Sequence, residues 1–239
     1  MFAAPNYLLL DIGNSCIKYA HVSAPTDAIV VKHCDDFVQL RALIGHATKV
    51  FLACVGKLQQ VDQIEMWCKE LSKPLHIAKT QAEQLGIQCA YGQFANLGID
   101  RWLAVLAARQ ITSLPVAVLD LGTANTCDVV VDNQHQGGWI APGFVLMKES
   151  LFTNTQQVFG DNNQPKVIDL GHSTPECVNF GCLAAIQGFV AMAEQHMATH
   201  YQDYKLMITG GAQAILPQPM PAHWLSFPNL VLMGLARFI

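Results

Sequence analysis

Apolar and polar positions along the chain follow two periods, one typical of buried strands and one typical of amphipathic helices. Short apolar runs bounded by turn residues predict strands at residues 7–10, 17–22, 29–32, 50–55, 116–120, 127–132, 137–140 and 205–209. Apolar residues three or four positions apart predict helices at residues 37–44, 61–71, 102–110 and 176–196. Because strands alternate with helices, we predict an α/β fold in which helices flank a sheet.

The segment 176–196 has the clearest helical pattern. Its apolar residues Val178, Cys182, Ala185, Phe189 and Met192 recur at helical spacing and define one face. Such a face is more typical of core or subunit packing than of a cofactor site. The preceding segment, residues 154–175, is polar and rich in Asn, Gln, Gly and Pro, which predicts a mobile loop.

One strand-and-turn pattern occurs twice. Residues 8–18 and 117–127 each contain an apolar strand that ends in Asp, an apolar residue, Gly and small polar residues, followed by a second strand. Asp11 and Asp120 lie 109 residues apart, close to half of the 239-residue chain. We therefore predict a duplicated pair of α/β domains, residues 1–112 and 113–239, with a boundary near Thr112-Ser-Leu-Pro115.

The composition narrows the function classes. Hydrophobic residues make up 51% and charged residues 13% of the chain, and the mean hydropathy is +0.26. No apolar run reaches the roughly 18 residues of a transmembrane helix, so no membrane partner is predicted. With 14 Lys and Arg against 18 Asp and Glu, the chain lacks the basic surplus needed to bind nucleic acid. We interpret the low charge as an apolar surface covered by a second copy, which predicts a homo-oligomer.

The amino terminus and the cysteines indicate the compartment. Residues 1–6 contain no Lys or Arg, and the apolar stretch that follows is too short for a signal-peptide core, which predicts a cytoplasmic protein. The eight cysteines are scattered singly, without a C-x-x-C pair or a Cys/His grouping at zinc spacing. We expect reduced and mostly buried thiols.

The repeated turns are candidate phosphate sites. A strand that ends in Asp-x-Gly and small polar residues presents backbone N–H groups that can bind phosphate, although an ordinary tight turn has the same sequence. Two copies in matching contexts favour phosphate binding. Lys18, four residues after Asn14, is either a phosphate ligand or a solvated strand lysine. P-loop, Rossmann, H-E-x-x-H and G-x-S-x-G motifs are absent from the sequence.

Three further segments each allow two interpretations. Asp100 suits an N-cap of the helix predicted at 102–110, whereas Arg101 beside it suits anion binding or a surface salt bridge. Gly137-Gly-Trp-Ile-Ala-Pro-Gly143 and Gly210-Gly211 are either plain turns or places where the backbone approaches a ligand closely.

Taken together, these segments resemble type III pantothenate kinases. The resemblance lies in Asp11-Ile-Gly-Asn-Ser15 with Lys18, Gly98-Ile-Asp-Arg101, Asp120-Leu-Gly-Thr123, Gly137 to Gly143 and Pro228-Asn-Leu-Val-Leu-Met-Gly-Leu235. The motifs follow one another in the family's order over nearly the whole chain. The resemblance implies the actin, hexokinase and Hsp70 superfold, with two ribonuclease-H-like domains and ATP in the cleft between them.

The resemblance also implies an activity: ATP-dependent phosphorylation of pantothenate to 4′-phosphopantothenate, the first step of coenzyme A biosynthesis, with Mg²⁺ and a potassium or ammonium ion. Asp100 would be the proton acceptor rather than an N-cap, and Asp120 would bind the monovalent cation. The ATP phosphates would be held by Asp11, Ile12, Gly13, Asn14, Ser15, Cys16, Ile17 and Lys18, with Thr123, Gly210 and Gly211 against the rest of the nucleotide. Pantothenate would be bound by Tyr91, Gly98, Ile99, Asp100, Arg101 and Thr174, in a pocket completed across a homodimer interface near helix 176–196.

The chain departs from the family pattern at two places. Ser15 stands where the family commonly has Thr, which retains the hydroxyl, and residues 176–180 after Thr174 are bulkier than usual. Two other functions remain open. One is a kinase of the same superfold for another small alcohol, and the other is a nucleotide-binding regulator without turnover.

Overall fold

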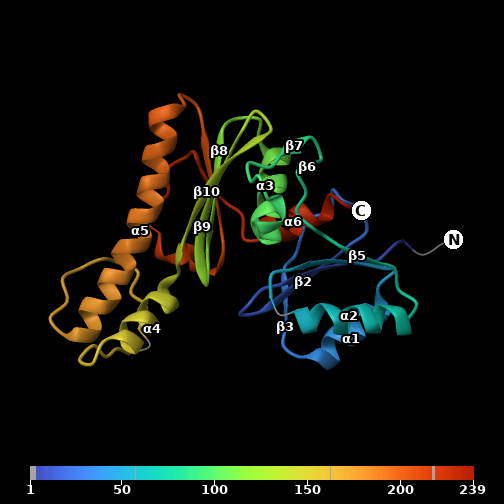
Figure 1. Ribbon diagram of the computed structural model, residues 1–239, viewed down its shortest axis with the longest axis horizontal. Helices are drawn as coiled ribbons and strands as arrows, with labels where there is room; N and C mark the ends of the chain where they lie inside the picture. The colour runs from blue at the N-terminus through green and yellow to red at the C-terminus, as the bar shows by residue number, and fades with distance from the viewer. Residues whose placement is uncertain (1–3, 57, 162, 217–218) are drawn as a thin grey trace. The chain divides into compact units, whose positions relative to one another are not determined.

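The structure is a computed structural model that describes residues 4–56, 58–161, 163–216 and 219–239. Its contacts divide the chain into two compact units. The first unit comprises Met1–Ile111, Asn133–His135 and Asn229–Ile239, and the second comprises Thr112–Asp132 and Gln136–Pro228. The carboxyl-terminal segment therefore packs with the first unit, although it is far from that unit in sequence (Figure 1).

The first unit is built on a five-stranded sheet in the order β3-β2-β1-β4-β5. The strands are β1 (Tyr7–Ile12), β2 (Ile17–Val22), β3 (Lys32–Cys34), β4 (Lys49–Cys54) and β5 (Leu75–Ile77). Strands β1, β2 and β3 form antiparallel pairs, whereas β4 runs parallel to both β1 and β5.

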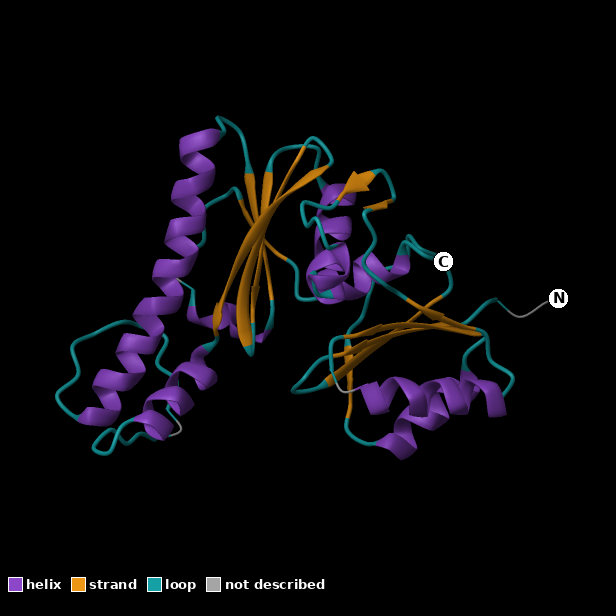
Figure 2. Cartoon of the chain, in the orientation of Figure 1, coloured by secondary structure: helices purple, strands orange, loops and turns teal. Residues whose placement is uncertain are grey.

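Helices cover both faces of this first sheet (Figure 2). They are α1 (Phe37–His46) and α2 (Leu58–Glu70) on one face, and α3 (Ile99–Ile111) and α6 (Leu230–Ala236) on the other. Leu8, Leu9 and Leu10 are therefore buried in succession, with Leu8 and Leu10 in the cluster that contains Leu40 and Ile64 of α1 and α2.

The second unit contains a sheet with the same strand order. Its strands are β8 (Val116–Leu121), β9 (Ala124–Val131), β10 (Gln134–Pro142), β11 (Lys205–Thr209) and β12 (Trp224–Ser226), in the order β12-β11-β8-β9-β10 within a seven-stranded sheet. Strands β8 and β9 are antiparallel, and β11 runs parallel to β8 and β12. Helices α4 (Phe144–Asn154) and α5 (Thr174–His200) pack against each other, and α5 packs on β8.

The remaining short elements lie around these sheets. The hairpin of β6 (Glu83–Gln84) and β7 (Ile87–Gln88) supplies the other two strands of the seven-stranded sheet, because β7 pairs with Gln134, the first residue of β10. Gln134 itself belongs to the first unit. Two 3₁₀ turns, η1 (Phe94–Asn96) and η2 (Gly211–Ile215), precede α3 and β12 respectively.

The matching strand orders confirm the duplicated α/β fold. In each unit the first two strands form an antiparallel pair, and a later strand returns parallel to the first. Asp11 is the fifth of six residues in β1, and Asp120 is the fifth of six in β8. The two Asp-x-Gly turns therefore leave equivalent strand ends, as expected for the actin and hexokinase superfold.

Helix α5 begins at Thr174, two residues before the predicted start. Ser173 caps it, because its side chain accepts a hydrogen bond from the Glu176 N–H at 3.4 Å. The predicted apolar face holds for Val178 and Cys182, but Ala185 and Met192 are exposed. The buried face continues instead through Ile186, Val190, Ala193 and Met197, because it advances mostly in steps of four rather than alternating four and three.

Helix α5 is also held at its carboxyl-terminal half. The Glu194 carboxylate accepts hydrogen bonds from Tyr204 Oη, from His223 Nε2 at 2.7 Å and from Trp224 Nε1 at 2.7 Å. Burial alone would raise the pKa of Glu194, but these hydrogen bonds outweigh burial and lower the pKa. The same carboxylate raises the pKa of Tyr204 to about 12.

By length and composition, α5 would suffice to cross a membrane. Its buried face makes it a core helix of the second unit.

Several predicted elements needed correction. The strand predicted at 29–32 is β3 at residues 32–34, and β9 begins at Ala124 rather than at residue 127. Helix α4 was not predicted, because Val145 and Leu146 on its exposed side obscure an apolar stripe. Residues 155–161 and 163–173, within the predicted loop, contain neither helix nor strand. All eight cysteines are free, but only Cys34, Cys68, Cys127 and Cys182 are fully buried.

Candidate active site

The first repeated turn joins β1 to β2 through Gly13, Asn14, Ser15 and Cys16. The Gly13 N–H donates to the Cys16 carbonyl at 3.1 Å, which closes the turn. Asn14, Ser15 and Cys16 are exposed, whereas Ile12 is fully buried. The turn therefore presents its polar residues to solvent from a buried strand end, as expected for a phosphate loop.

Asp11 and Lys18 lie directly opposite each other in the β1–β2 register. Residues opposite each other in an antiparallel pair project from the same face of the sheet, so the carboxylate and the ammonium group share one side of the turn. His33 of β3 is opposite Lys18 on the next strand. Both Asp11 and Lys18 are half-buried. This placement favours a role for Lys18 at the turn over that of a freely solvated lysine.

A cavity of about 390 Å³ lies beside the first turn. Its wall is formed by residues 13–17 of the turn, residues 34–37 before and within α1, and Gln60 of α2. Gln60 was not singled out from the sequence, because a single glutamine on a helix carries no motif. Nearby, burial and the charge of Asp11 raise the pKa of the Cys54 thiol, while a backbone hydrogen bond from Gly56 opposes the rise.

The second repeated turn is enclosed by two glycines from other segments. The Gly143 N–H donates to the Thr123 carbonyl at 2.9 Å, and a Cβ at Gly143 would lie 2.0 Å from the Gly122 carbonyl oxygen. Gly210 has φ +92°, and a Cβ there would lie 2.3 Å from the Leu121 carbonyl oxygen and 2.4 Å from Asp120 Oδ1. Only glycine allows this approach. The structure thus brings together three segments that are far apart in the sequence, namely the second turn, Gly143 and Gly210.

The oxygens around Gly210 suit a hard cation. Asp120 Oδ1 and the Leu121 carbonyl oxygen both lie close against Gly210, 2.4 Å and 2.3 Å from the position that a Cβ on that residue would take. Carboxylate and carbonyl oxygens are the ligands that such cations prefer. Among the described residues, no three His, Cys, Asp or Glu side chains gather as a metal site. A cation at Asp120 would therefore depend on backbone carbonyls as well.

Asp100 lies in the first turn of α3 and is not its N-cap. The Trp102 N–H donates to the Gly98 carbonyl at 3.0 Å, so Gly98 occupies the capping position. Asp100 Oδ1 accepts a hydrogen bond from the Arg101 N–H at 2.8 Å. A Cβ at Gly98 would lie 2.6 Å from the same oxygen. The N-cap interpretation of Asp100 was wrong by two residues, and the glycine instead makes room for the carboxylate.

Tyr91 and Arg101, both expected to bind substrate, lie in contact. Arg101 is only 6% exposed, and its Nη1 donates to Tyr91 Oη at 3.2 Å. The buried guanidinium lies beside the first turn of α3, where the helix dipole also favours an anion. Ile99, the first residue of α3, is buried, and Gly98 and Asp100 are half-buried. The structure thus assembles residues 98–101 and Tyr91 in one place within the first unit.

Two side chains that sequence reasoning missed support this group. His135 stacks on Tyr91 with ring centroids 6.2 Å apart, and Trp102 donates from Nε1 to Gln84 Oε1 at 2.6 Å. His135 lies 44 residues from Tyr91 in sequence, so no local pattern connects them.

Thr174 lies in the second unit, at the first position of α5. It forms part of the wall of a cavity of about 910 Å³ between α4, α5 and residues 171–173. Apolar side chains such as Met147, Leu151 and Val178 make up much of the remaining wall. Thr174 is therefore accessible, but it is not grouped with residues 98–101 inside one unit.

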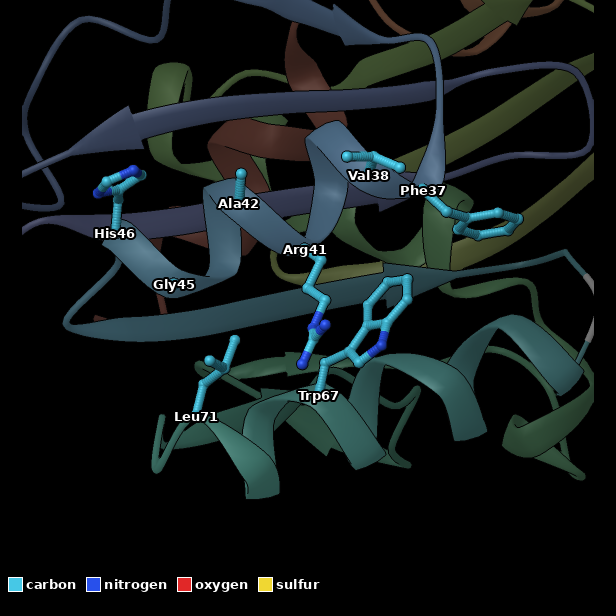
Figure 3. Close-up of a pocket in the computed structure, with 8 residues that line it drawn as sticks. All are labelled: Phe37, Val38, Arg41, Ala42, Gly45, His46, Trp67 and Leu71. Atoms are coloured by element: carbon cyan, nitrogen blue, oxygen red, sulfur yellow. The ribbon is translucent and has the colours of Figure 1, made fainter.

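Another cavity lies away from the predicted site residues. It is a groove of about 640 Å³ between α1 and α2, in which Arg41 and Trp67 extend toward each other (Figure 3). Arg41 Nη2 donates to Glu70 Oε2 at 3.1 Å, and both side chains are about half exposed. Such an exposed ion pair contributes little to stability.

The chain is similar to known proteins over nearly its whole length. A family model described as type III pantothenate kinase matches residues 7–196. A protein named type III pantothenate kinase from Pseudoalteromonas atlantica is 47% identical over 98% of this chain and 97% of its own length. A protein of the same name from Ectopseudomonas mendocina is 31% identical over 96% of this chain and 97% of its own length.

Two solved structures share the fold at low sequence identity. A Campylobacter jejuni protein named for the Baf family of transcriptional activators gives a TM-score of 0.61 at 20% identity, covering 97% of this chain and 96% of that one. A Sinorhizobium meliloti protein named for 2-dehydro-3-deoxygalactonokinase gives a TM-score of 0.59 at 10% identity, covering 97% of both chains.

Proposed function

Because this chain belongs to the family of type III pantothenate kinases, we propose that it transfers the γ-phosphoryl group of ATP to the primary hydroxyl of pantothenate. The observation that supports this most strongly is the grouping of Asp100, Arg101 and Tyr91 around the first turn of α3. A pure nucleotide-binding regulator has no need of a carboxylate and a buried guanidinium at an acceptor site.

Asp100 is the proposed general base. The Arg101 N–H bond to Oδ1 and the close packing over Gly98 fix the direction of the carboxylate. In phosphoryl transfer the protein contributes mainly positioning and charge neutralisation, because the transition state is loose. Asp100 accepts the proton of the pantothenate hydroxyl as its oxygen bonds to the γ-phosphorus and the bond to the β–γ bridging oxygen breaks, releasing ADP.

Arg101 is the proposed partner of the pantothenate carboxylate. Its Nη1 donates to Tyr91 Oη, and guanidinium groups bind carboxylates through paired hydrogen bonds. Tyr91 holds the guanidinium from one side, while Gly98 and Ile99 supply backbone at the start of the helix. Removing Arg101 should therefore raise the KM for pantothenate more than the KM for ATP.

The two Asp-x-Gly turns are the proposed ATP contacts. Residues 11–18 supply backbone N–H groups, the Ser15 hydroxyl and the Lys18 ammonium to the phosphates, and Thr123, Gly210 and Gly211 contact the rest of the nucleotide. Support comes from the exposed residues of the first turn and from the tight approach of Gly210 to the second. Charge on the phosphates is offset by the Lys18 side chain and the turn amides.

Two cations are part of this proposal. Mg²⁺ is proposed to arrive with ATP, with Asp11 as an outer partner, and to neutralise phosphate charge. A potassium or ammonium ion is proposed at Asp120, whose carboxylate lies together with the Leu121 carbonyl oxygen against Gly210. Sodium, being smaller, should substitute poorly there.

We further propose a cytoplasmic homodimer in which a second copy covers apolar surface of the second unit. Large apolar side chains of this unit are exposed, among them Ile140, Val145 and Met192 at 64%, 60% and 54%, and contiguous exposed apolar surface marks protein–protein interaction sites. Thr174 is proposed to complete the pantothenate site of the assembly. Light scattering at micromolar concentration should give twice the chain mass of 26.1 kDa, and a monomer would contradict the dimer.

The activity is tested by product analysis. Purified protein with ATP, Mg²⁺ and K⁺ should convert pantothenate to a product with one added phosphate, identified by mass spectrometry and ³¹P NMR. Omitting K⁺ and NH₄⁺ should lower the rate at least tenfold. A panel of other small alcohols serves as the control. Phosphorylation of another alcohol with pantothenate left intact would establish a different kinase, and tight ATP binding without transfer would establish a regulator.

A further inference from the structure

We infer that His135 is a positioning residue for the acceptor site, one that holds the Tyr91 ring against Arg101. The inference rests on the proposed role of Tyr91 and Arg101 in binding pantothenate. It concerns a residue that belongs to none of the sequence motifs and that is far from the site in sequence.

Asn133 and Gln134, directly before His135, are held by β7 and by α3. The Gln88 N–H donates to the Asn133 carbonyl at 2.9 Å, and Gln134 pairs with Gln88 as β10 begins beside β7. Arg109 Nε of α3 donates to Asn133 Oδ1 at 3.0 Å. The backbone just before His135 is thus anchored to the hairpin and to the helix that carries Asp100.

The imidazole of His135 packs against Tyr91 and against Trp102, the residue that follows Arg101. It is 3% exposed and lies nearly parallel to the Tyr91 ring, with an interplanar angle of 20° and centroids 6.2 Å apart. The Trp102 ring also lies beside it, with ring centroids 6.2 Å apart and an interplanar angle of 63°. The Ala90 N–H donates to His135 Nδ1 at 3.4 Å. That hydrogen bond is long and therefore weak, so ring packing is the stronger of these contacts.

These contacts reach the site through Tyr91. The Tyr91 hydroxyl accepts from Arg101 at 3.2 Å, near the upper limit of a good hydrogen bond, so a small rotation of the ring would break it. Trp102, on the other side of His135, is fully buried and held by Gln84, so it offers no room for His135 to move. A flat ring at position 135 therefore limits the positions open to Tyr91.

The test compares three substitutions that separate the ring from its nitrogen. His135→Ala removes both, His135→Asn retains an acceptor near Nδ1 without the ring, and His135→Phe retains a ring without the acceptor. A ring pair of this kind contributes enough to change the KM for pantothenate about twofold to tenfold. We expect this rise in the Ala and Asn variants, a change of less than twofold in the Phe variant, and an unchanged KM for ATP. His46→Ala, an exposed histidine of α1, is the matched control.

A double-mutant cycle then shows whether His135 acts through Tyr91. In a Tyr91→Ala background, His135→Ala should change the KM for pantothenate by less than twofold. An equal rise in both backgrounds, a parallel rise in the KM for ATP, or a Phe variant as impaired as Ala would overturn the inference. If the Ala variant fails to fold, the Asn and Phe variants give the same comparison. A wild-type protein that leaves pantothenate unphosphorylated would refute the proposed function instead.

Discussion

Replacing Gly98 by alanine would disturb the proposed catalytic base directly. The added Cβ would lie 2.6 Å from Asp100 Oδ1, whereas ordinary contacts of this kind begin near 3.4 Å. The carboxylate must therefore move by about 0.8 Å, or turn away from the Arg101 N–H that it now accepts. A misplacement of about 1 Å in a catalytic group can cost on the order of 100-fold in rate.

The stability of the Gly98→Ala protein should change little. No positive φ is recorded at Gly98, so alanine fits the backbone there. The lower entropy of the unfolded chain and the poorer capping by alanine should nearly cancel, leaving the free energy of unfolding within about 1 kcal/mol. We therefore expect kcat to fall about 10- to 100-fold while urea unfolding is nearly unchanged.

The assay measures pantothenate-dependent ADP release alongside urea unfolding. Gly45→Ala in α1 is the matched control, because no heavy atom lies within 4 Å of its added Cβ. It should retain wild-type kcat and gain about 0.5–1 kcal/mol, as alanine does in a helix. A Gly98→Ala enzyme with kcat within twofold of wild type would refute the argument that this packing sets the position of Asp100.

Three further predictions concern the rest of the molecule. Gly210→Ala, at φ +92° and 2.3 Å from the Leu121 carbonyl oxygen, should lower the free energy of unfolding by about 2–4 kcal/mol in urea and weaken ATP binding by calorimetry. Because hydrogen bonds lower the pKa of Glu194 in the folded protein, the stability they add is present above its unfolded pKa and lost as pH falls through the folded pKa. Glu194→Gln should therefore cost about 1–3 kcal/mol at pH 7 and progressively less below about pH 4 in urea titrations, and a cost independent of pH would contradict this. Mg-ATP should slow disulfide-reagent labelling of the exposed Cys16 at least fivefold and leave the exposed Cys177 unaffected, and equal labelling would place ATP elsewhere.

The sequence allowed the repeated architecture to be predicted because its signal is local. Each Asp-x-Gly turn follows a buried strand, and the structure places Asp11 and Asp120 at equivalent strand positions. Burial on both sheet faces made the strands continuous apolar runs, which are easy to locate. Helix α4 was missed because its exposed apolar residues hide the period of its buried side.

The site required tertiary contacts that no local pattern contains. The approach of Gly143 and Gly210 to the second turn joins three segments far apart in sequence. His135 lies beside Tyr91 because Asn133 and Gln134, directly before it, pair with Gln88 of β7. The capping position of α3 was misjudged because Asp is a common N-cap, whereas here the glycine two residues earlier starts the helix.

Transfer of labelled γ-phosphate from ATP to pantothenate, by wild type and by Asp100→Asn under identical conditions, tests the central claim most directly. Asn retains the size of Asp100 and can still accept from the Arg101 N–H, but it cannot take a proton. General-base removal typically costs 100- to 10,000-fold, so the account predicts rapid transfer by wild type and at least a 100-fold loss in the variant, with unchanged ATP affinity. Equal transfer by both proteins would contradict the assignment of Asp100, and no transfer by wild type would contradict the proposed reaction.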